Sequence, residues 1–338
     1  MFDVQEFGLS MKTLDIKKLY SGGLITNYFC SSRCRHCLYG CGPEWERIYI
    51  EPEQAEKNLL KVKSLGCTSV HIGGGEPFLR PDGLLEVLKV AKKTGVAIEY
   101  VETNSSWFKD EKSACAILEK LKPHGLETVL VSVSPFHNEF IPFMKVKGVI
   151  NACRITGVGI FPWMKTFIPE TGSFDETSIH NLEEYEQRYG KKYMIDLISR
   201  YGLTMRGRAL RTYAEKLNRR SLEEILKAND GGCYELSDVS HFHVDLFGNY
   251  IPGLCTGLSI RLEDLGKPLG IVDYLMLNIL YEKGIGAFLE FASLNYGFRA
   301  EREYLSKCEL CFEIRRHLVL NRKIVSKELQ PGEFYSNV

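Results

Sequence analysis

Three cysteines fall within eight residues near the start of the chain. Cys30, Cys34 and Cys37 have the spacing C-x3-C-x2-C. Three thiolates this close together can hold three irons of a cubic [4Fe-4S] cluster, which leaves the fourth iron without a thiolate. Most iron-sulfur electron carriers supply four thiolates. The spacing therefore predicts a cluster whose open iron binds a reactant.

The cysteine spacing leaves a zinc site open as an alternative. Structural zinc sites close with four ligands, commonly two C-x2-C pairs. Cys34 and Cys37 could form such a site with Cys308 and Cys311, which are also separated by two intervening residues. A further alternative is that the triplet consists of three buried thiols that bind no metal.

The composition is that of a globular protein. Of 338 residues, 44% are hydrophobic and 25% are charged, and 43 basic residues balance 43 acidic ones. A net charge of zero gives no global field that would attract nucleic acid, and no nucleic-acid partner is expected. Residues 1–18 lack the apolar run of a signal peptide, and no apolar stretch is long enough to span a bilayer. We therefore expect a cytoplasmic location without membrane contact. Clustered cysteines there indicate metal ligands rather than disulfides.

The elements that must position the triplet follow an alternating pattern. Apolar and β-branched runs predict strands, and apolar residues at helical spacing predict the segments between them. The expected strands are 24–29, 68–72, 96–101, 128–133, 159–167 and 202–206. The expected helices are 52–65, 83–94, 112–122, 142–156 and 177–189. This order predicts an α/β fold with parallel strands, a partial (β/α)6 TIM-like barrel.

The alternation stops near residue 217. Residues 241–252 predict a β-hairpin that turns at Gly248-Asn249, and apolar helical stretches follow. We expect an N-terminal segment (1–23), a partial barrel (24–216) and a C-terminal α+β extension (217–338). The motifs of the barrel follow its strands, and the working face of such folds lies at the carboxyl ends of the strands.

Two motifs together resemble a known superfamily. The triplet follows the first strand, and His36 precedes its last cysteine, while Gly74-Gly75-Glu76-Pro77 follows the second strand. This combination resembles the radical S-adenosylmethionine (SAM) enzymes and their GGEP motif. The resemblance covers about residues 24–215, and neither a zinc module nor an electron carrier needs a methionine-binding loop.

The resemblance implies cofactors and residue roles. Cys30, Cys34 and Cys37 would hold a [4Fe-4S] cluster, and SAM would chelate its open iron. The backbone of the GGEP stretch and Glu76 would meet the methionyl ammonium. The other implied SAM contacts are His36 beside the adenine, and Asn104, Ser132 and Ser134 near the ribose or the methionyl carboxylate. The alternative role of Asn104 and Ser134 is that of turn or cap residues.

Four further cysteines form a second candidate site, Cys233, Cys255, Cys308 and Cys311. With Gly207-Arg208-Ala209 after the last expected strand, they resemble the SPASM and twitch domains of radical SAM maturases. The resemblance implies one auxiliary [4Fe-4S] cluster, and a single zinc ion on the same thiolates is the alternative. Cys67, Cys115 and Cys153 are expected to be core thiols, and Cys41 is a weak candidate near the triplet.

The expected function is reductive cleavage of SAM to a 5′-deoxyadenosyl radical that abstracts hydrogen from a substrate. Peptide or protein maturation, by crosslinking or oxidation, is the favoured class. The alternatives are a radical SAM dehydrogenase or methyltransferase acting on a small molecule, a non-catalytic iron-sulfur electron carrier, and a zinc-binding module. The expected partners are a reductant such as ferredoxin or flavodoxin and the substrate itself. Glu102, Lys165, His71, His137, His241 and His243 are weaker candidates for substrate contacts.

Overall fold

The computed structural model describes residues 11–338. The chain divides into two compact units. The α/β unit contains residues 22–204 together with 245–248. The C-terminal unit contains residues 205–244 and 249–338 together with the described residues before 22. The division expected near residue 217 stays a prediction.

The α/β unit is built on a parallel sheet with the order β5-β4-β3-β2-β1. Its strands are β1 (Gly22–Ile25), β2 (Ser69–Gly73), β3 (Ala97–Thr103), β4 (Thr128–Ser132) and β5 (Gly159–Trp163). Its helices are α2 (Pro52–Ser64), α3 (Pro81–Thr94), α4 (Glu111–Leu121), α5 (Pro135–Asn138), α6 (Phe143–Thr156), α7 (Ile168–Thr171), α8 (Leu182–Tyr189) and α9 (Tyr193–Tyr201). The predicted α/β fold with the parallel strands of a partial TIM-like barrel is confirmed, with five parallel strands instead of the six expected.

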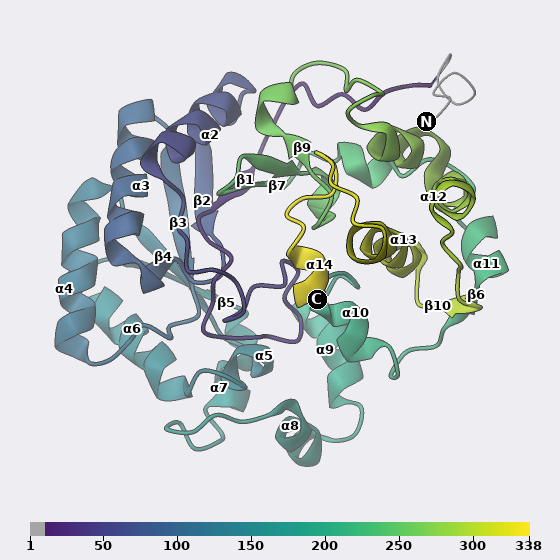
Figure 1. Cartoon of the computed structure of the whole chain (residues 1–338). Helices are drawn as coiled ribbons and strands as arrows, with labels where there is room; N and C mark the ends of the chain where they lie inside the picture. The colour runs from purple at the N-terminus through teal and green to yellow at the C-terminus, as the bar shows by residue number, and fades with distance from the viewer. Residues whose placement is uncertain (1–10) are drawn as a thin grey trace. The chain divides into compact units, whose positions relative to one another are not determined.

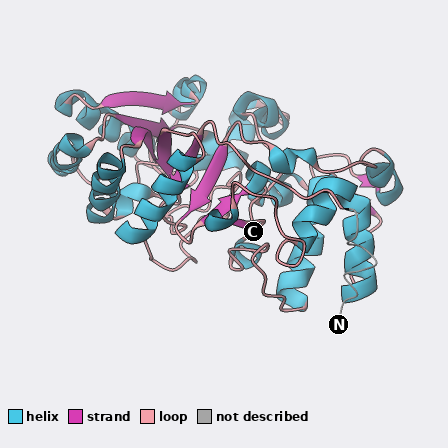
Figure 2. Ribbon diagram, turned by 90° about the horizontal axis from the view of Figure 1, so that it is seen from above, coloured by secondary structure: helices cyan, strands magenta, loops and turns pink. Residues whose placement is uncertain are grey.

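Helices α2, α3, α4 and α6 cover one face of this sheet (Figure 1). Their apolar residues recur at helical spacing, as in α3, where Leu84, Val87, Leu88 and Ala91 are all buried. Figure 2 shows the strands as broad arrows flanked by these helices. Residues that face the helices, such as Val101 and Val129, are fully buried.

The predicted strand at 202–206 is wrong. Gly202 ends α9 in the left-handed conformation (φ 71°). The backbone N–H of Gly202 donates to Ser199, and that of Leu203 donates to Ile198. These residues complete the helix end, so their N–H groups do not join the sheet. Three boundaries differ by four residues or more: β1 ends at Ile25 instead of residue 29, β5 ends at Trp163 instead of residue 167, and α8 begins at Leu182 instead of residue 177.

The C-terminal unit is mixed, with short strands. Strands β7 (Phe242–Asp245) and β8 (Asn249–Ile251) pair antiparallel, and β8 pairs antiparallel with β9 (Ile260–Arg261). The predicted hairpin is therefore formed. The remaining elements are α10 (Arg208–Tyr213), β6 (Arg220–Ser221), α11 (Leu222–Lys227), α12 (Leu275–Tyr296), β10 (Glu303–Tyr304), α13 (Lys307–Arg316) and α14 (Phe334–Asn337).

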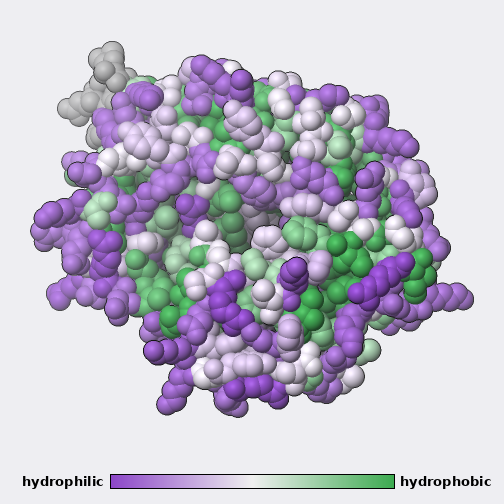
Figure 3. Space-filling view, turned by 180° about the vertical axis from the view of Figure 1, so that it is seen from behind, coloured by the Kyte–Doolittle hydropathy of each residue, from purple (hydrophilic) through white to green (hydrophobic). Residues whose placement is uncertain are grey.

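The surface in Figure 3 is mostly hydrophilic, with separate apolar areas between the polar side chains. Among residues 11–338, no helix combines the length and the apolar character that crossing a membrane requires.

Candidate functional site

The loop after β1 closes on itself and gathers the three cysteines. Phe29 and Gly42 form an isolated parallel bridge, and the Cys30 N–H donates to the Gly42 carbonyl over 3.2 Å. Within the loop, the Cys37 N–H donates to the Cys34 carbonyl over 3.0 Å. The predicted ligands Cys30, Cys34 and Cys37 therefore line one cavity of about 950 Å³. Cys41, the weak candidate, lines it too.

The Gly74-Gly75-Glu76-Pro77 loop leaves the end of β2 and lies against the cysteine loop. The Gly75 N–H donates to the Asn27 carbonyl (2.7 Å), and the Glu76 N–H donates to the Phe29 carbonyl (3.2 Å). A Cβ atom at residue 75 would lie 2.0 Å from the Phe29 oxygen, so only glycine permits this approach. Gly74, Gly75 and Pro77 line the cavity.

The carboxylate of Glu76 forms hydrogen bonds with other residues of the protein. It accepts hydrogen bonds from Phe78 N (3.1 Å), Thr103 Oγ1 (2.9 Å) and Asn104 N (2.6 Å). Burial raises its pKa to about 7, although these donors oppose the shift. Glu76 is absent from the residues that line the cavity. Its side chain thus ties the loop after β2 to the loop after β3, and the expected contact with a methionyl ammonium stays a prediction.

Asn104 lines the cavity beside the first cysteine. Its side-chain Nδ2 donates to Cys30 Sγ over 3.3 Å and lies 3.4 Å from Ser32 Oγ. Its Oδ1 accepts the backbone N–H of Ser106 at 2.8 Å. The side chain therefore closes a turn, as the cap interpretation expects, and also reaches a predicted cluster ligand.

His36 lies in an aromatic cluster at the same cavity. Its Nε2 is 3.0 Å from the hydroxyl of Tyr201, and its ring centroid is 4.6 Å from that of Phe136 and 5.0 Å from that of His137. Burial lowers the pKa of His137 to about 4, so this imidazole is neutral at ordinary pH. The cluster presents an aromatic wall, which is a suitable surface for a nucleobase.

The two predicted serines are placed differently. Ser132, at the end of β4, lines the cavity. Ser134 is 1% exposed, precedes α5, and its hydroxyl lies 2.7 Å from His137 Nδ1. Tyr39, Tyr201 and Thr204 also line the cavity and were missed from the sequence. No local signal marks them, because Tyr201 and Thr204 come from the end of a helix and the irregular segment after it.

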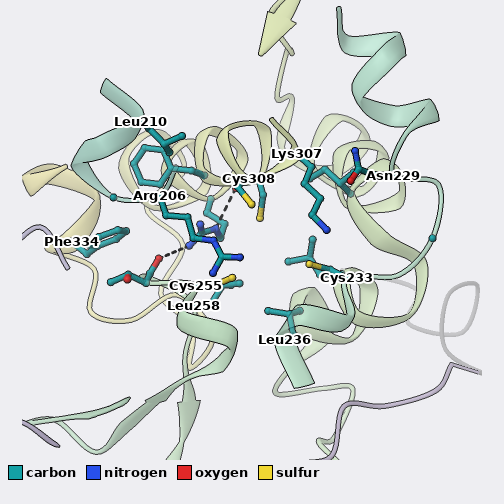
Figure 4. A pocket seen from close by; sticks show the side chains of 18 residues that line it. Arg206, Leu210, Asn229, Cys233, Leu236, Cys255, Leu258, Lys307, Cys308 and Phe334 are labelled. Atoms are coloured by element: carbon teal, nitrogen blue, oxygen red, sulfur yellow. Dashed lines mark hydrogen bonds between the residues drawn. The ribbon is translucent and has the colours of Figure 1, made fainter. Parts of the chain in front are cut away.

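A second cavity, of about 670 Å³, lies within the C-terminal unit and brings together the other four predicted ligands. Cys233 precedes a short 3-10 turn, and its N–H donates to the Leu280 carbonyl over 2.8 Å. Cys255 follows the turn after β8. Cys308 and Cys311 lie three residues apart in the first turns of α13, and therefore on one helix face. Figure 4 shows this cavity.

Cationic side chains surround these four cysteines. Arg206, Lys307 and Arg315 line the cavity, and the Arg206 side chain extends toward Cys255 and Cys308 (Figure 4). Arg315 is 5% exposed and donates to the carbonyls of Thr256 (2.8 Å) and Cys311 (3.3 Å). Burial raises the pKa of Cys255 to about 11, so the unligated thiol is protonated. Four thiols beside three cations suit an anionic metal–thiolate centre, either a cluster or a zinc ion.

Comparison with known proteins identifies the first site. The family model of the Radical SAM superfamily matches residues 24–158, which contain both the cysteine triplet and the Gly-Gly-Glu-Pro loop. Residues 24–158 therefore form a radical SAM domain. Such a domain implies a [4Fe-4S] cluster and SAM, and the three cysteines around one cavity fit that cluster.

Among relatives, the GTP 3′,8-cyclase of Aquifex aeolicus is 30% identical over 114 residues, which is 32% of this chain and 33% of the relative. A "Probable GTP 3′,8-cyclase" of Saccharolobus islandicus is 28% identical over 152 residues, which is 43% of this chain and 46% of the relative. The chain thus matches less than half the length of these relatives. The solved structure of histidine-tagged anSMEcpe with bound AdoMet covers 90% of this chain and 97% of its own, with 12% identity and a TM-score of 0.41.

Proposed function

We propose that this protein cleaves SAM reductively and uses the resulting radical in the maturation of a peptide or protein. The cluster, when bound, supplies the electron that splits SAM into methionine and a 5′-deoxyadenosyl radical, which abstracts hydrogen from the substrate. The observation that carries the proposal is the shared cavity. The three cysteines, Gly74, Gly75 and Asn104 line it together, within the segment that matches the superfamily.

The residues of the cavity have distinct proposed roles. Cys30, Cys34 and Cys37 hold the cluster and leave one iron for SAM. Gly74 and Gly75 let the backbone approach the methionyl group, since side chains there would collide with residues 27–29. The aromatic cluster around His36 receives the adenine. Ser132 and Ser134 stay proposed SAM contacts, and Ser134 would act there only if its hydroxyl turns away from His137.

The C-terminal cavity is proposed to hold an auxiliary [4Fe-4S] cluster on Cys233, Cys255, Cys308 and Cys311. All four thiols are supplied by the protein, so no iron would remain open for a substrate. Its proposed role is to accept or donate an electron. The three cations at this cavity would offset the negative charge of such a cluster. A zinc ion on the same thiols is the competing occupant.

A nucleotide substrate is the second candidate, because the relatives named above are GTP cyclases. The lining of the first cavity disfavours it there. Glu102 is the single carboxylate among the lining residues, and no lysine or arginine is among them. A triphosphate would meet a negative group and no compensating cation. A substrate without phosphates is therefore preferred for this cavity.

The decisive experiment is anaerobic reconstitution with iron and sulfide, followed by dithionite and SAM, with 5′-deoxyadenosine measured by mass spectrometry. The wild-type protein should form 5′-deoxyadenosine. The Cys34→Ala variant should form none, whereas the matched control Cys115→Ala, whose thiol lines neither cavity, should behave as wild type. A wild-type protein with a complete cluster that forms no 5′-deoxyadenosine would contradict the proposal.

A further inference from the structure

The parallel sheet has two chemically different faces. Paired residues of neighbouring strands share a face, and alternate residues along a strand point to opposite faces. The row Val101, Val129 and Ile160 lies on the helix-covered face. The adjacent row, Glu102, Leu130 and Phe161, lies on the opposite face, and Trp163 follows Phe161 on that same side. We call the face that carries Glu102, Phe161 and Trp163 the inner face.

The inner face carries a continuous row of aromatic rings. His71 stacks on Tyr100 with centroids 5.0 Å apart, Tyr100 meets Phe161 at 6.0 Å, and Phe161 meets Trp163 at 6.0 Å. Phe161 is 43% exposed and Trp163 is 37% exposed. Rings whose only role is core packing would be buried, so this exposure indicates a surface that is available to a ligand.

Glu102 supplies the negative charge of this surface. Its carboxylate lies over Gly73 of the adjacent strand β2. A Cβ atom at residue 73 would lie 2.7 Å from Glu102 Oε2. His71 lies beside this carboxylate, with Nε2 3.8 Å from Glu102 Oε1. The side chain is 39% exposed, because it opens into the cavity that the cysteines line. A carboxylate that faces a cavity without a lysine or arginine is ready to pair with a cation from outside the chain.

SAM is the first cationic ligand to consider for Glu102. The predicted SAM contacts Gly74, Gly75 and Asn104 lie on loops beyond the carboxyl ends of β2 and β3. The aromatic row begins on the other side, since His71 and Tyr100 precede Gly73 and Glu102 along their strands, and it runs past Phe161, level with Glu102, to Trp163, level with Ser132. Glu102 therefore lies where the cysteine cavity meets the aromatic inner face, and the rings beside it form a surface on which a second ligand can lie next to SAM.

We propose that the inner face binds a cationic nitrogen of the substrate, an ammonium such as that of a lysine side chain, between Glu102 and the rings of Tyr100, Phe161 and Trp163. This inference rests on the proposed function and adds a substrate class to it. The carboxylate neutralises the ammonium, and the ring faces attract the cation and its aliphatic stem. A neutral aliphatic side chain would gain only the contact with the rings and not the pairing with Glu102.

The test uses two probes that differ in the terminal ammonium group, which acetyl-Gly-Lys-Gly-amide carries and acetyl-Gly-norleucine-Gly-amide lacks. The reconstituted protein with SAM is labelled with 5-fluorotryptophan and titrated by fluorine NMR. Trp45 and Trp107 are 7% and 8% exposed, whereas Trp163 lies on the proposed site, so its resonance reports binding. The lysine probe should bind at least tenfold more tightly than the norleucine probe. A third titration, with butylammonium, shows whether the amine alone is sufficient for binding or whether the peptide backbone adds affinity.

The variant Glu102→Gln should remove the preference for lysine, and Glu119→Gln, an exposed change on α4, should keep it. Equal affinity of the two probes for the wild-type protein would overturn the inference without relying on any variant. A preserved preference in a Glu102→Gln protein with wild-type circular dichroism would overturn it as well. Formation of 5′-deoxyadenosine by the wild-type protein without probe tests the proposed function separately.

Discussion

The side-chain amide of Asn104 donates to Cys30 Sγ over 3.3 Å. The backbone N–H of Ser32 approaches the same sulfur at 3.4 Å. The amide is held in this orientation, because Asn104 Oδ1 accepts from Ser106 and the Asn104 backbone N–H donates to Glu76. Hydrogen bonds to the sulfurs are one determinant of the potential of an iron-sulfur cluster. An N–H donor stabilises the more negative, reduced state.

Asn104→Leu should therefore lower the reduction potential of the SAM-binding cluster. Loss of this hydrogen bond should lower the equilibrium constant for reduction of the cluster by up to about tenfold. For one electron, this corresponds to a decrease of about 59 mV in the reduction potential. An EPR-monitored redox titration measures the shift. The titration is performed in a Cys308→Ala/Cys311→Ala background, so that a single cluster is observed.

Asn151→Leu is the matched control for this measurement. Asn151 is exposed on α6 and its amide donates to Glu111, far in sequence from the cysteine loop. The control should titrate at the wild-type potential. An unchanged potential in Asn104→Leu, with full iron content, would show that the bond to Cys30 has no influence on the cluster.

The sequence predicts the ligands because their signal is local. The cysteine spacing and the Gly-Gly-Glu-Pro run each occupy a few neighbouring residues, and each follows a strand whose pattern is readable. The bond from Asn104 to Cys30 joins residues 74 positions apart, and the contact of Tyr201 with His36 joins residues 165 positions apart. No periodicity in one sequence reports contacts at such separations.

One local prediction is wrong because tertiary context determined the structure there. Residues 202–206 include Leu203 and Thr204, which have adequate strand propensity, yet their backbone completes the end of α9. The ligand contact of Glu76 stays a prediction, and tertiary context adds contacts that the sequence did not indicate. In the structure three donors of the protein already occupy its carboxylate.

Gly75→Ala should prevent the loop after β2 from forming correctly. The added Cβ atom would lie 2.0 Å from the Phe29 oxygen, and a backbone carbonyl cannot rotate away as a side chain would. We expect a loss of stability of about 1–3 kcal/mol from overpacking, together with loss of SAM binding. Thermal unfolding and calorimetric SAM titration measure the two effects.

Gly231→Ala is the control for this substitution. No atom lies within 4 Å of a Cβ atom built at Gly231, so the change should leave SAM binding as in wild type. If Gly75→Ala bound SAM with wild-type affinity, the close approach of the loop to residue 29 would not matter for the site.

Iron content distinguishes the occupants of the C-terminal cavity. Wild-type protein should contain about eight irons per chain if both cavities hold [4Fe-4S] clusters, and Cys308→Ala/Cys311→Ala about four. Cys115→Ala should retain about eight, because its thiol lines neither cavity. A content of about four irons and one zinc in the wild-type protein would show that the C-terminal cavity holds a structural zinc ion and not an auxiliary cluster.

The affinity of the lysine probe should increase between pH 6 and pH 8. Enclosure by the cavity walls desolvates the Glu102 carboxylate and raises its pKa to about 7, so the carboxylate is mostly protonated at pH 6 and mostly ionised at pH 8. The other titratable groups near it are His71, Glu76, Tyr39, Tyr100 and Tyr201. The tyrosine pKa values are all raised, so these hydroxyls stay neutral over this range.

The lysine ammonium has an ordinary pKa near 10.4 and is charged throughout. Affinity should therefore rise about tenfold with ionisation of the carboxylate, because only the ionised form pairs with the cation. Fluorine NMR titrations at pH 6, 7 and 8 measure the change. The norleucine probe should show no such rise, and Glu102→Gln should give a flat profile. A rise of the same size in Glu102→Gln would assign the titration to His71 or Glu76 instead of Glu102.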